Sequence, residues 1–114
     1  MARKFGSNAG VSHFLEFGLR VVGSAYVPHM NGYDSFIVWA DNRGHFMWKA
    51  AWSHFPGAHF FNSLEIMGSQ PATTRDIRRR LDQWVVDHQL GSEDPAMENV
   101  ENLRRQLDMQ HLSL

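Results

Sequence analysis

Three histidines in the middle of the chain come closest, by type and spacing, to a metal site. His54 and His59 lie five residues apart on either side of Pro56-Gly57, and His45 stands just before an aromatic stretch. Imidazole nitrogens on neighbouring strands can bind zinc. The chain has no Cys and no His-Glu-x-x-His pattern, and acidic residues are sparse here. Surface positions therefore explain these histidines better, and a small His-based metal site or enzyme is kept as an alternative.

Short motifs for covalent catalysis or phosphate binding are not found. The chain lacks the Gly-x-Ser-x-Gly turn that positions a nucleophilic serine. The segment Gly6–Gly10 contains glycines but lacks the Gly-Lys-Ser/Thr ending of a phosphate-binding loop. We therefore expect a protein that is not an enzyme and that needs no cofactor.

Arginine is concentrated in the segment Arg75–Arg80, which contains the run Arg78-Arg79-Arg80. Arginine suits bidentate contacts to phosphate or carboxylate, so a nucleic-acid-binding regulator using this segment is an alternative. On a helix, three consecutive side chains point about 100° apart and do not form one patch. Asp76 and Asp82 also stand where they can form ion pairs with the run. A solvated helix face is therefore the favoured interpretation.

A β-hairpin is predicted in the first half of the chain. The apolar segments Phe36–Ala40 and Phe46–Trp52 flank the segment Asp41–Gly44. Asp and Asn initiate turns by accepting hydrogen bonds from their own backbone, and Gly adopts a positive φ, which together predict a type I turn with a bulge. Alternation places Trp48 and Trp52 on the same face of the second strand.

Two further segments complete the expected first half. Residues 11–22 have apolar side chains at helical spacing and end at Gly23, which predicts a short N-terminal helix. A strand over residues 18–27 is the competing interpretation of the same region. A third strand of the sheet is predicted over roughly residues 58–67, where apolar side chains occupy both faces.

The second half of the chain has one aromatic residue out of fourteen and is predicted to be helical. Thr74 is expected to cap a helix over residues 74–90, and Gly91 is expected to end it. The apolar stripe of this helix falls at helical spacing. Its members are Ile77, Leu81, Trp84, Val85 and His88.

A last helix is predicted to begin at Asp94-Pro95, an N-cap followed by a proline at the first helical position. Its apolar stripe is narrow, like a coiled-coil seam. The stripe consists of Val100, Leu103, Leu107 and Leu114. Two interpretations stay open: residues 96–114 form a homodimer or partner interface, or the helix folds back as an antiparallel hairpin on the preceding one.

The expected architecture is α+β: a three-stranded antiparallel sheet with a short N-terminal helix and a C-terminal helical hairpin. At 114 residues we expect a single domain, with a flexible tail at 1–10, a helix and sheet at 11–70, and two helices at 71–114. The net charge of −1 argues against binding nucleic acid or membrane by bulk charge. Neither a signal peptide nor a membrane-spanning segment is evident, so a cytoplasmic location is expected.

In overall build the chain resembles small phage or mobile-element inhibitors such as anti-CRISPR proteins. The resemblance rests on small size, the lack of Cys and the lack of catalytic motifs over the whole chain. It implies a non-enzymatic protein–protein interaction module that blocks a host-defence complex by covering its working surface. Interfaces favour tryptophan and arginine. The expected partner-binding residues are Arg78, Arg79, Val100, Leu103, Leu107, Trp39 and Trp48.

Overall fold

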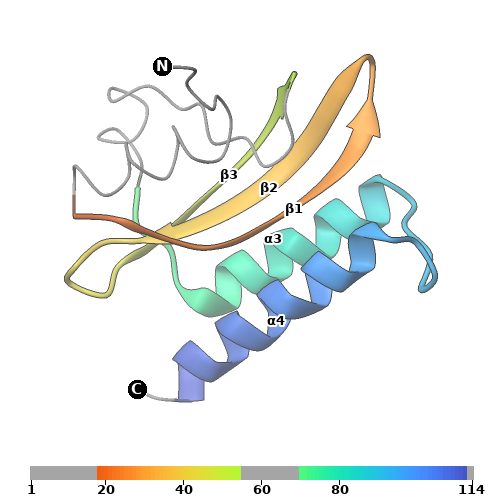
Figure 1. Cartoon of the computed structure of the whole chain (residues 1–114). Coiled ribbons are helices and arrows are strands. Elements are labelled where there is room, and N and C mark those ends of the chain that lie inside the picture. Colours follow the sequence, from red (N-terminus) through yellow and green to blue (C-terminus); the bar gives the residue numbers. More distant parts are fainter. Residues whose placement is uncertain (1–17, 55–69, 113–114) are drawn as a thin grey trace.

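The protein is an α+β structure in which two helices pack against one face of a three-stranded antiparallel sheet (Figure 1). The computed structural model describes residues 18–54 and 70–112, and the account below concerns these residues. The strands, in the spatial order β1-β2-β3, are β1 (Arg20–His29), β2 (Gly32–Ala40) and β3 (Phe46–Ser53). The helices are α3 (Thr74–Asp87) and α4 (Ala96–Leu112). The predicted fold class is thereby confirmed at this level.

The predicted hairpin is confirmed, and it joins β2 to β3 with Ala40 opposite Phe46. The Asp41 carboxylate accepts hydrogen bonds from the backbone N–H groups of Arg43 (2.9 Å) and His45 (2.8 Å). Gly44 adopts a φ of 86°, as the bulge of such a turn requires. The His45 backbone N–H, followed by that of Arg43, lowers the pKa of Asp41, more than offsetting the opposing effect of desolvation.

Strand β1 supports the competing interpretation of the N-terminal region, which predicted a strand over residues 18–27. Arg20–His29 pair with β2, so the helix predicted over residues 11–22 is wrong for residues 20–22. The remainder of that helix, residues 11–17, lies outside the described residues, as do the tail at 1–10 and the strand predicted over 58–67. Val22 fits a helical spacing, but it lies at a register shift within β1, between Val21 and Gly23, which pair with Trp39 and Val38 of β2.

The turn between β1 and β2 consists of two residues with positive φ, Met30 (51°) and Asn31 (63°). Positive φ at both central positions defines the type I′ turn, whose twist matches that of the flanking strands. The next residue, Gly32, has no room for a side chain. A Cβ there would lie 2.4 Å from the Ser53 carbonyl oxygen and 2.5 Å from the Trp52 ring. The indole of Trp52 therefore lies directly over the start of β2.

Helix α3 begins at Thr74, as predicted, but its N-cap lies one residue earlier than predicted. Thr73, and not Thr74, is the N-cap, and its hydroxyl accepts a hydrogen bond from the Asp76 N–H (3.0 Å). The predicted stop at Gly91 is also wrong, because the helix ends at Asp87 and the positive φ (55°) falls on Gln89. The Gln89 and Leu90 N–H groups bond back to the carbonyls of the last helical turn, which is a Schellman ending.

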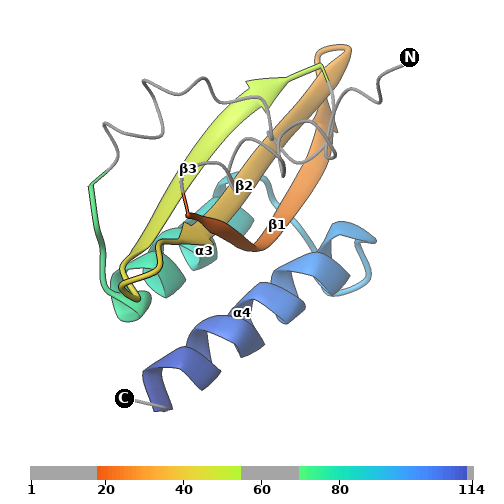
Figure 2. The same ribbon diagram turned by 60° about the vertical axis from the view of Figure 1, so that its left-hand side comes forward.

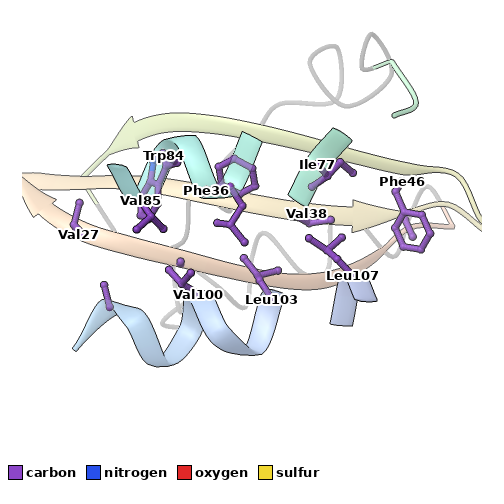
Figure 3. Packing of buried hydrophobic residues seen from close by; sticks show 14 residues of the cluster. Val27, Phe36, Val38, Phe46, Ile77, Trp84, Val85, Val100, Leu103 and Leu107 are labelled. Carbon is purple, nitrogen blue, oxygen red and sulfur yellow. The ribbon is translucent and has the colours of Figure 1, made fainter. Parts of the chain in front are cut away.

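Helix α4 begins as predicted, with an Asp94 carboxylate oxygen accepting from the Ala96 N–H (2.9 Å). Val100, Leu103 and Leu107 of its apolar stripe pack into the core between sheet and helices, which Figure 3 shows from close by. The fourth member of the predicted stripe, Leu114, lies outside the described residues. Leu103 lies so close to β1 that a Cβ on Gly23 would be 2.8 Å from its side chain. Figure 2 shows α4 running beside α3 on the same side of the sheet. The antiparallel helical hairpin is therefore the interpretation that the structure supports.

The sheet also buries side chains on the face away from the helices. Four apolar residues form this second cluster, and each is at most 8% exposed. They are Leu19, Ile37, Trp39 and Met47. Strand β2 therefore has apolar side chains on both faces, as expected of the central strand of a sheet that is covered on both sides.

Candidate protein-binding surface

The apolar residues of α4 that were predicted to bind a partner lie in the protein's own core. Val100, Leu103 and Leu107 are at most 1% exposed. They belong to the cluster that joins both helices to the sheet. A homodimer or partner seam along these residues is therefore corrected to an internal packing stripe, since a partner cannot reach them without opening the fold.

Trp39 is also inaccessible to a partner. Its side chain is fully buried in the cluster on the face of the sheet opposite α3 and α4. Tryptophan contributes most to an interface when its ring can contact a partner, and this ring cannot. The structure thus assigns Trp39 to the core.

Arg78 connects the two helices. Its guanidinium donates to the Asp108 carboxylate of α4 (2.6 Å) and lies 3.5 Å from Asp82 of its own helix. Arg104 of α4 reaches Asp82 from the other side (2.9 Å). Burial lowers the pKa of Arg78, but the carboxylates of Asp108 and Asp82 raise it above its usual value overall. Arg78 therefore links α3 to α4, and its guanidinium is already engaged by carboxylates of the protein itself.

The other arginines of the run differ in their partners. Arg79 donates to the Asp76 carboxylate, and Arg80 lies 3.9 Å from the same group. Arg75 has no acidic partner among the residues that the structure describes. The nucleic-acid alternative is weakened by this pairing, because the single carboxylate of Asp76 offsets positive charge that would otherwise attract a phosphate backbone.

Trp48 holds an intermediate position at the margin of the core. Its ring stacks on Phe36 at a centroid distance of 5.2 Å and an interplanar angle of 12°. The guanidinium of Arg80 lies over the ring, 5.7 Å from its centroid. This is a cation–π geometry, which holds the charged group of Arg80 at the surface between α3 and β3.

Trp52 extends this surface along β3. It lies on the same face as Trp48, with Ala50 exposed between them, because side chains alternate along a strand. Trp52 is 41% exposed, and its Nε1 donates to the His29 carbonyl (2.7 Å), which fixes the orientation of the ring. Together Trp48, Ala50, Trp52 and Arg80 form what we call the tryptophan surface. It combines fixed aromatic rings with a cation, the composition typical of interface hot spots.

The histidines do not form a metal centre in the described part of the chain. His45 Nδ1 lies 3.0 Å from the Asp41 carboxylate, and the His54 ring packs edge-on against Trp52. His59 lies outside the described residues. Among residues 18–54 and 70–112, no group of three or more His, Asp or Glu side chains is arranged to hold a metal ion.

A different histidine has the geometry of a catalytic dyad. His88 Nε2 lies 3.1 Å from the Asp34 carboxylate of β2, at the edge of a cavity of about 510 Å³. Its Nδ1 lies 2.8 Å from the Trp84 carbonyl oxygen. A general base needs a free ring nitrogen, and both nitrogens of His88 already face acceptors. The dyad therefore joins the end of α3 to the sheet.

Comparison with protein-family models, with curated proteins and with solved structures finds no match for this chain. Neither helix has the length and hydropathy that crossing a bilayer requires, over the described residues. The residues of the chain itself must therefore support any functional proposal.

Three residues of the tryptophan surface, Ala50, Trp52 and Arg80, were absent from the predicted partner-binding set. Trp52 was predicted to share a face with Trp48, but alternation along a strand does not say which side chains of that face stay exposed. Arg80 was grouped with its neighbours as a helix-face charge, although it alone of the run lies over Trp48. Strand alternation was the sequence signal that could have added Trp52 to the predicted partner-binding residues. No signal in the sequence distinguishes Arg80 from the neighbouring arginines.

Proposed function

We propose that this protein is a non-enzymatic binding module that docks a protein partner on the tryptophan surface. The observation that carries the proposal is the fixed, exposed Trp52, which shares a face of β3 with Trp48, the ring over which the Arg80 guanidinium lies. A ring already held by a hydrogen bond loses little conformational entropy when it is covered by a partner. Ordered aromatic side chains of this kind supply much of the binding energy of protein interfaces.

The chemistry of this surface favours a partner segment with an apolar side chain next to a carboxylate. The apolar side chain would cover Trp52 and Ala50. The carboxylate would approach Arg80, whose nearest acidic neighbour within the described residues, Asp76, is 3.9 Å away and is shared with Arg79. In the inhibitor version of this proposal, which follows from the resemblance to anti-CRISPR proteins, docking here occludes the working surface of a host-defence complex.

The experiment is an affinity capture from extracts of the cells that encode the protein. The tagged full chain is compared with Trp52→Ala and Arg80→Ala. Two matched controls truncate exposed residues of α4, Met109→Ala for the apolar change and Arg105→Ala for the charge. Circular dichroism confirms that each variant is folded.

We expect proteins that the wild type captures to be lost with Trp52→Ala and reduced with Arg80→Ala, and to be retained by both controls. Capture that both surface variants retain, or that the α4 controls abolish, would overturn the proposal. Such an outcome would place the binding site on another face of the molecule.

A further inference from the structure

The two outer strands of the sheet differ in how readily a further strand could pair with them. The edge formed by β1 is interrupted, because the register shifts between Val21 and Gly23 and because Pro28 has no backbone N–H. Bulges and prolines are means by which proteins prevent pairing at an exposed sheet edge. Strand β3 pairs with β2 without a register shift and contains no proline. The outer edge of β3 therefore lacks both of these obstacles.

Backbone hydrogen bonds show which residues of β3 face this outer edge. The Asp41 N–H donates to the His45 carbonyl (3.0 Å), so the backbone groups of His45 face β2. The direction alternates along an antiparallel strand, so the N–H and C=O groups of Trp48, Ala50 and Trp52 face the outer edge. In the part of the chain that the structure describes, these groups have no backbone partner. The open edge therefore belongs to the same three residues of β3 that form the tryptophan surface.

One residue of the chain already pairs with this edge at its beginning. Ala72 forms an antiparallel bridge with Phe46, and its N–H donates to the Phe46 carbonyl (2.8 Å). The described chain just before Ala72 diverges from β3, as Figure 2 shows for the green segment that leads into α3. Farther along the strand, Ala50 and Trp52 are exposed. An extended segment can therefore reach the edge beyond the Ala72 bridge.

The side chains of such a segment would meet two different environments. Every second side chain of an added strand lies on the same face as its cross-strand neighbours Trp48, Ala50 and Trp52. An apolar side chain is favoured beside Ala50 and Trp52. Beside Trp48, the Arg80 guanidinium lies 5.7 Å from the ring centroid and favours a carboxylate. Strand β3 contains no acidic residue, so a second copy paired through β3 would not supply this carboxylate.

We propose that the partner adds a strand to the outer edge of β3, antiparallel to it, through main-chain hydrogen bonds to Trp48, Ala50 and Trp52. Addition of a strand to an open sheet edge is a common mode of peptide recognition. The antiparallel direction is that of the Ala72 bridge. The inference rests on the proposed function and specifies the partner as an extended segment with the pattern apolar-x-apolar-x-acidic. Its three patterned side chains lie opposite Trp52, Ala50 and Trp48, in that order.

The test is amide hydrogen exchange of the full-length protein, with and without the capped peptide Thr-Val-Thr-Val-Thr-Glu-Thr. In the free protein we expect rapid exchange at Trp48, Ala50 and Trp52, and slow exchange at Lys49 and Ala51, which face β2. Saturating peptide should slow exchange at the first three residues at least tenfold. Exchange at Lys49 and Ala51 should not change.

Two outcomes of this measurement would overturn strand addition. Slow exchange at Trp48, Ala50 and Trp52 in the free protein would show that the edge is already covered. A dependence of that protection on protein concentration would identify a second copy as the cover, and its absence would identify the chain itself. Unchanged rapid exchange in the presence of millimolar peptide would show that the edge does not pair with a strand.

Peptides with a single N-methyl group test the pairing itself. Methylation of the second valine removes the donor that faces Ala50 and should weaken binding about fivefold, the loss typical of one hydrogen bond. Methylation of the preceding threonine is the matched control, because its N–H points away from β3, and should leave the affinity unchanged. Equal effects of the two methyl groups would overturn the proposed hydrogen bonds.

The carboxylate is tested with Arg80→Gln and with a peptide that has glutamine in place of glutamate. Arg80→Gln should weaken binding of the glutamate peptide several-fold and leave binding of the glutamine peptide unchanged. Arg105→Gln, an exposed arginine of α4, is the control and should change neither affinity. Equal losses for both peptides would overturn the placement of the acidic residue beside Arg80.

A captured partner separates this inference from the proposed function. If Trp52→Ala loses the partner but the partner leaves exchange at Trp48 and Ala50 unchanged, the tryptophan surface is retained and strand addition is overturned. If the peptide protects these amides but Trp52→Ala retains the captured partner, the proposed function is overturned and the edge is retained as a peptide-binding site.

Discussion

At the scale of single residues, His88 is a partly buried polar side chain with a contact at each ring nitrogen. Its two ring nitrogens face the Trp84 carbonyl and the Asp34 carboxylate, at 2.8 and 3.1 Å. Both oxygens are acceptors, so both bonds can form together only when both ring nitrogens carry a proton. The ring also packs on Trp84 at 4.5 Å. His88 therefore connects the end of α3 to β2.

His88→Ala is expected to lower the free energy of unfolding by about 2 kcal/mol, because it removes the bond to Asp34 and leaves that carboxylate half-buried without its partner. Urea denaturation followed by circular dichroism measures the change. His29→Ala, at an exposed position, keeps the backbone carbonyl and is the control, and it should change stability by less than about 0.5 kcal/mol. Equal effects of the two substitutions would show that the His88 bonds contribute nothing.

The lowered pKa of Asp41 makes the stability of the protein depend on pH in the acidic range. The His45 and Arg43 N–H groups lower the pKa of Asp41 in the folded protein below the value of 3.8 expected for an unfolded chain. A lowered folded-state pKa means that the turn is stabilised above pH 3.8, and that this contribution is lost as the pH falls through that value and below. Asp41→Asn cannot titrate, so its unfolding midpoint should fall less steeply than that of the wild type between pH 5 and pH 2.5. Parallel curves would contradict this.

At the scale of elements, propensity and turn chemistry predicted the type of most segments but not their ends. In the Asp41–Gly44 turn and at the Asp94-Pro95 helix start, an aspartate side chain accepts hydrogen bonds from the backbone of the same segment. Both could therefore be predicted from the local sequence. The cap of α3 was misplaced because Thr73 and Thr74 are equally suitable in type. The β1–β2 hairpin went unpredicted although Asn31-Gly32 is a turn signal, because the apolar spacing of residues 11–22 also fits a helix.

The cap assignment is itself testable. Thr73→Ala is expected to destabilise the protein by about 1 kcal/mol, since it removes the acceptor of the Asp76 N–H. Thr73→Ser keeps a hydroxyl at the same position and should retain most of the stability. Thermal and urea denaturation of both variants make the measurement. A Thr73→Ser variant as unstable as Thr73→Ala would show that the methyl group, and not the hydrogen bond, is responsible.

At the scale of the whole molecule, the narrow stripe of α4 shows what a sequence alone leaves open. A narrow apolar stripe is typical of a helix that pairs with a coiled-coil partner. It is equally typical of a helix that packs against both a sheet and a second helix. The choice depends on the groove between β1 and α3, which no local pattern specifies. The tryptophan surface likewise arises only when β3 and α3 are brought together, so tertiary packing creates the candidate site.

The double substitution Leu103→Asp plus Leu107→Asp separates the two roles of α4. Because both side chains are at most 1% exposed, two buried carboxylates should unfold the protein, at a cost well above about 4 kcal/mol. Loss of the far-ultraviolet circular dichroism signal in the absence of denaturant is the expected result. A variant that stays folded but loses self-association would show that the stripe is an interface after all.

The most direct test of the binding proposal is the affinity of the captured partner, once purified, for the wild type, Trp52→Ala and Met109→Ala. We predict that Trp52→Ala weakens binding at least tenfold, as truncation of a central interface tryptophan typically does, and that Met109→Ala leaves the affinity unchanged. Unchanged binding by a folded Trp52→Ala variant would contradict the assignment of the tryptophan surface as the docking site.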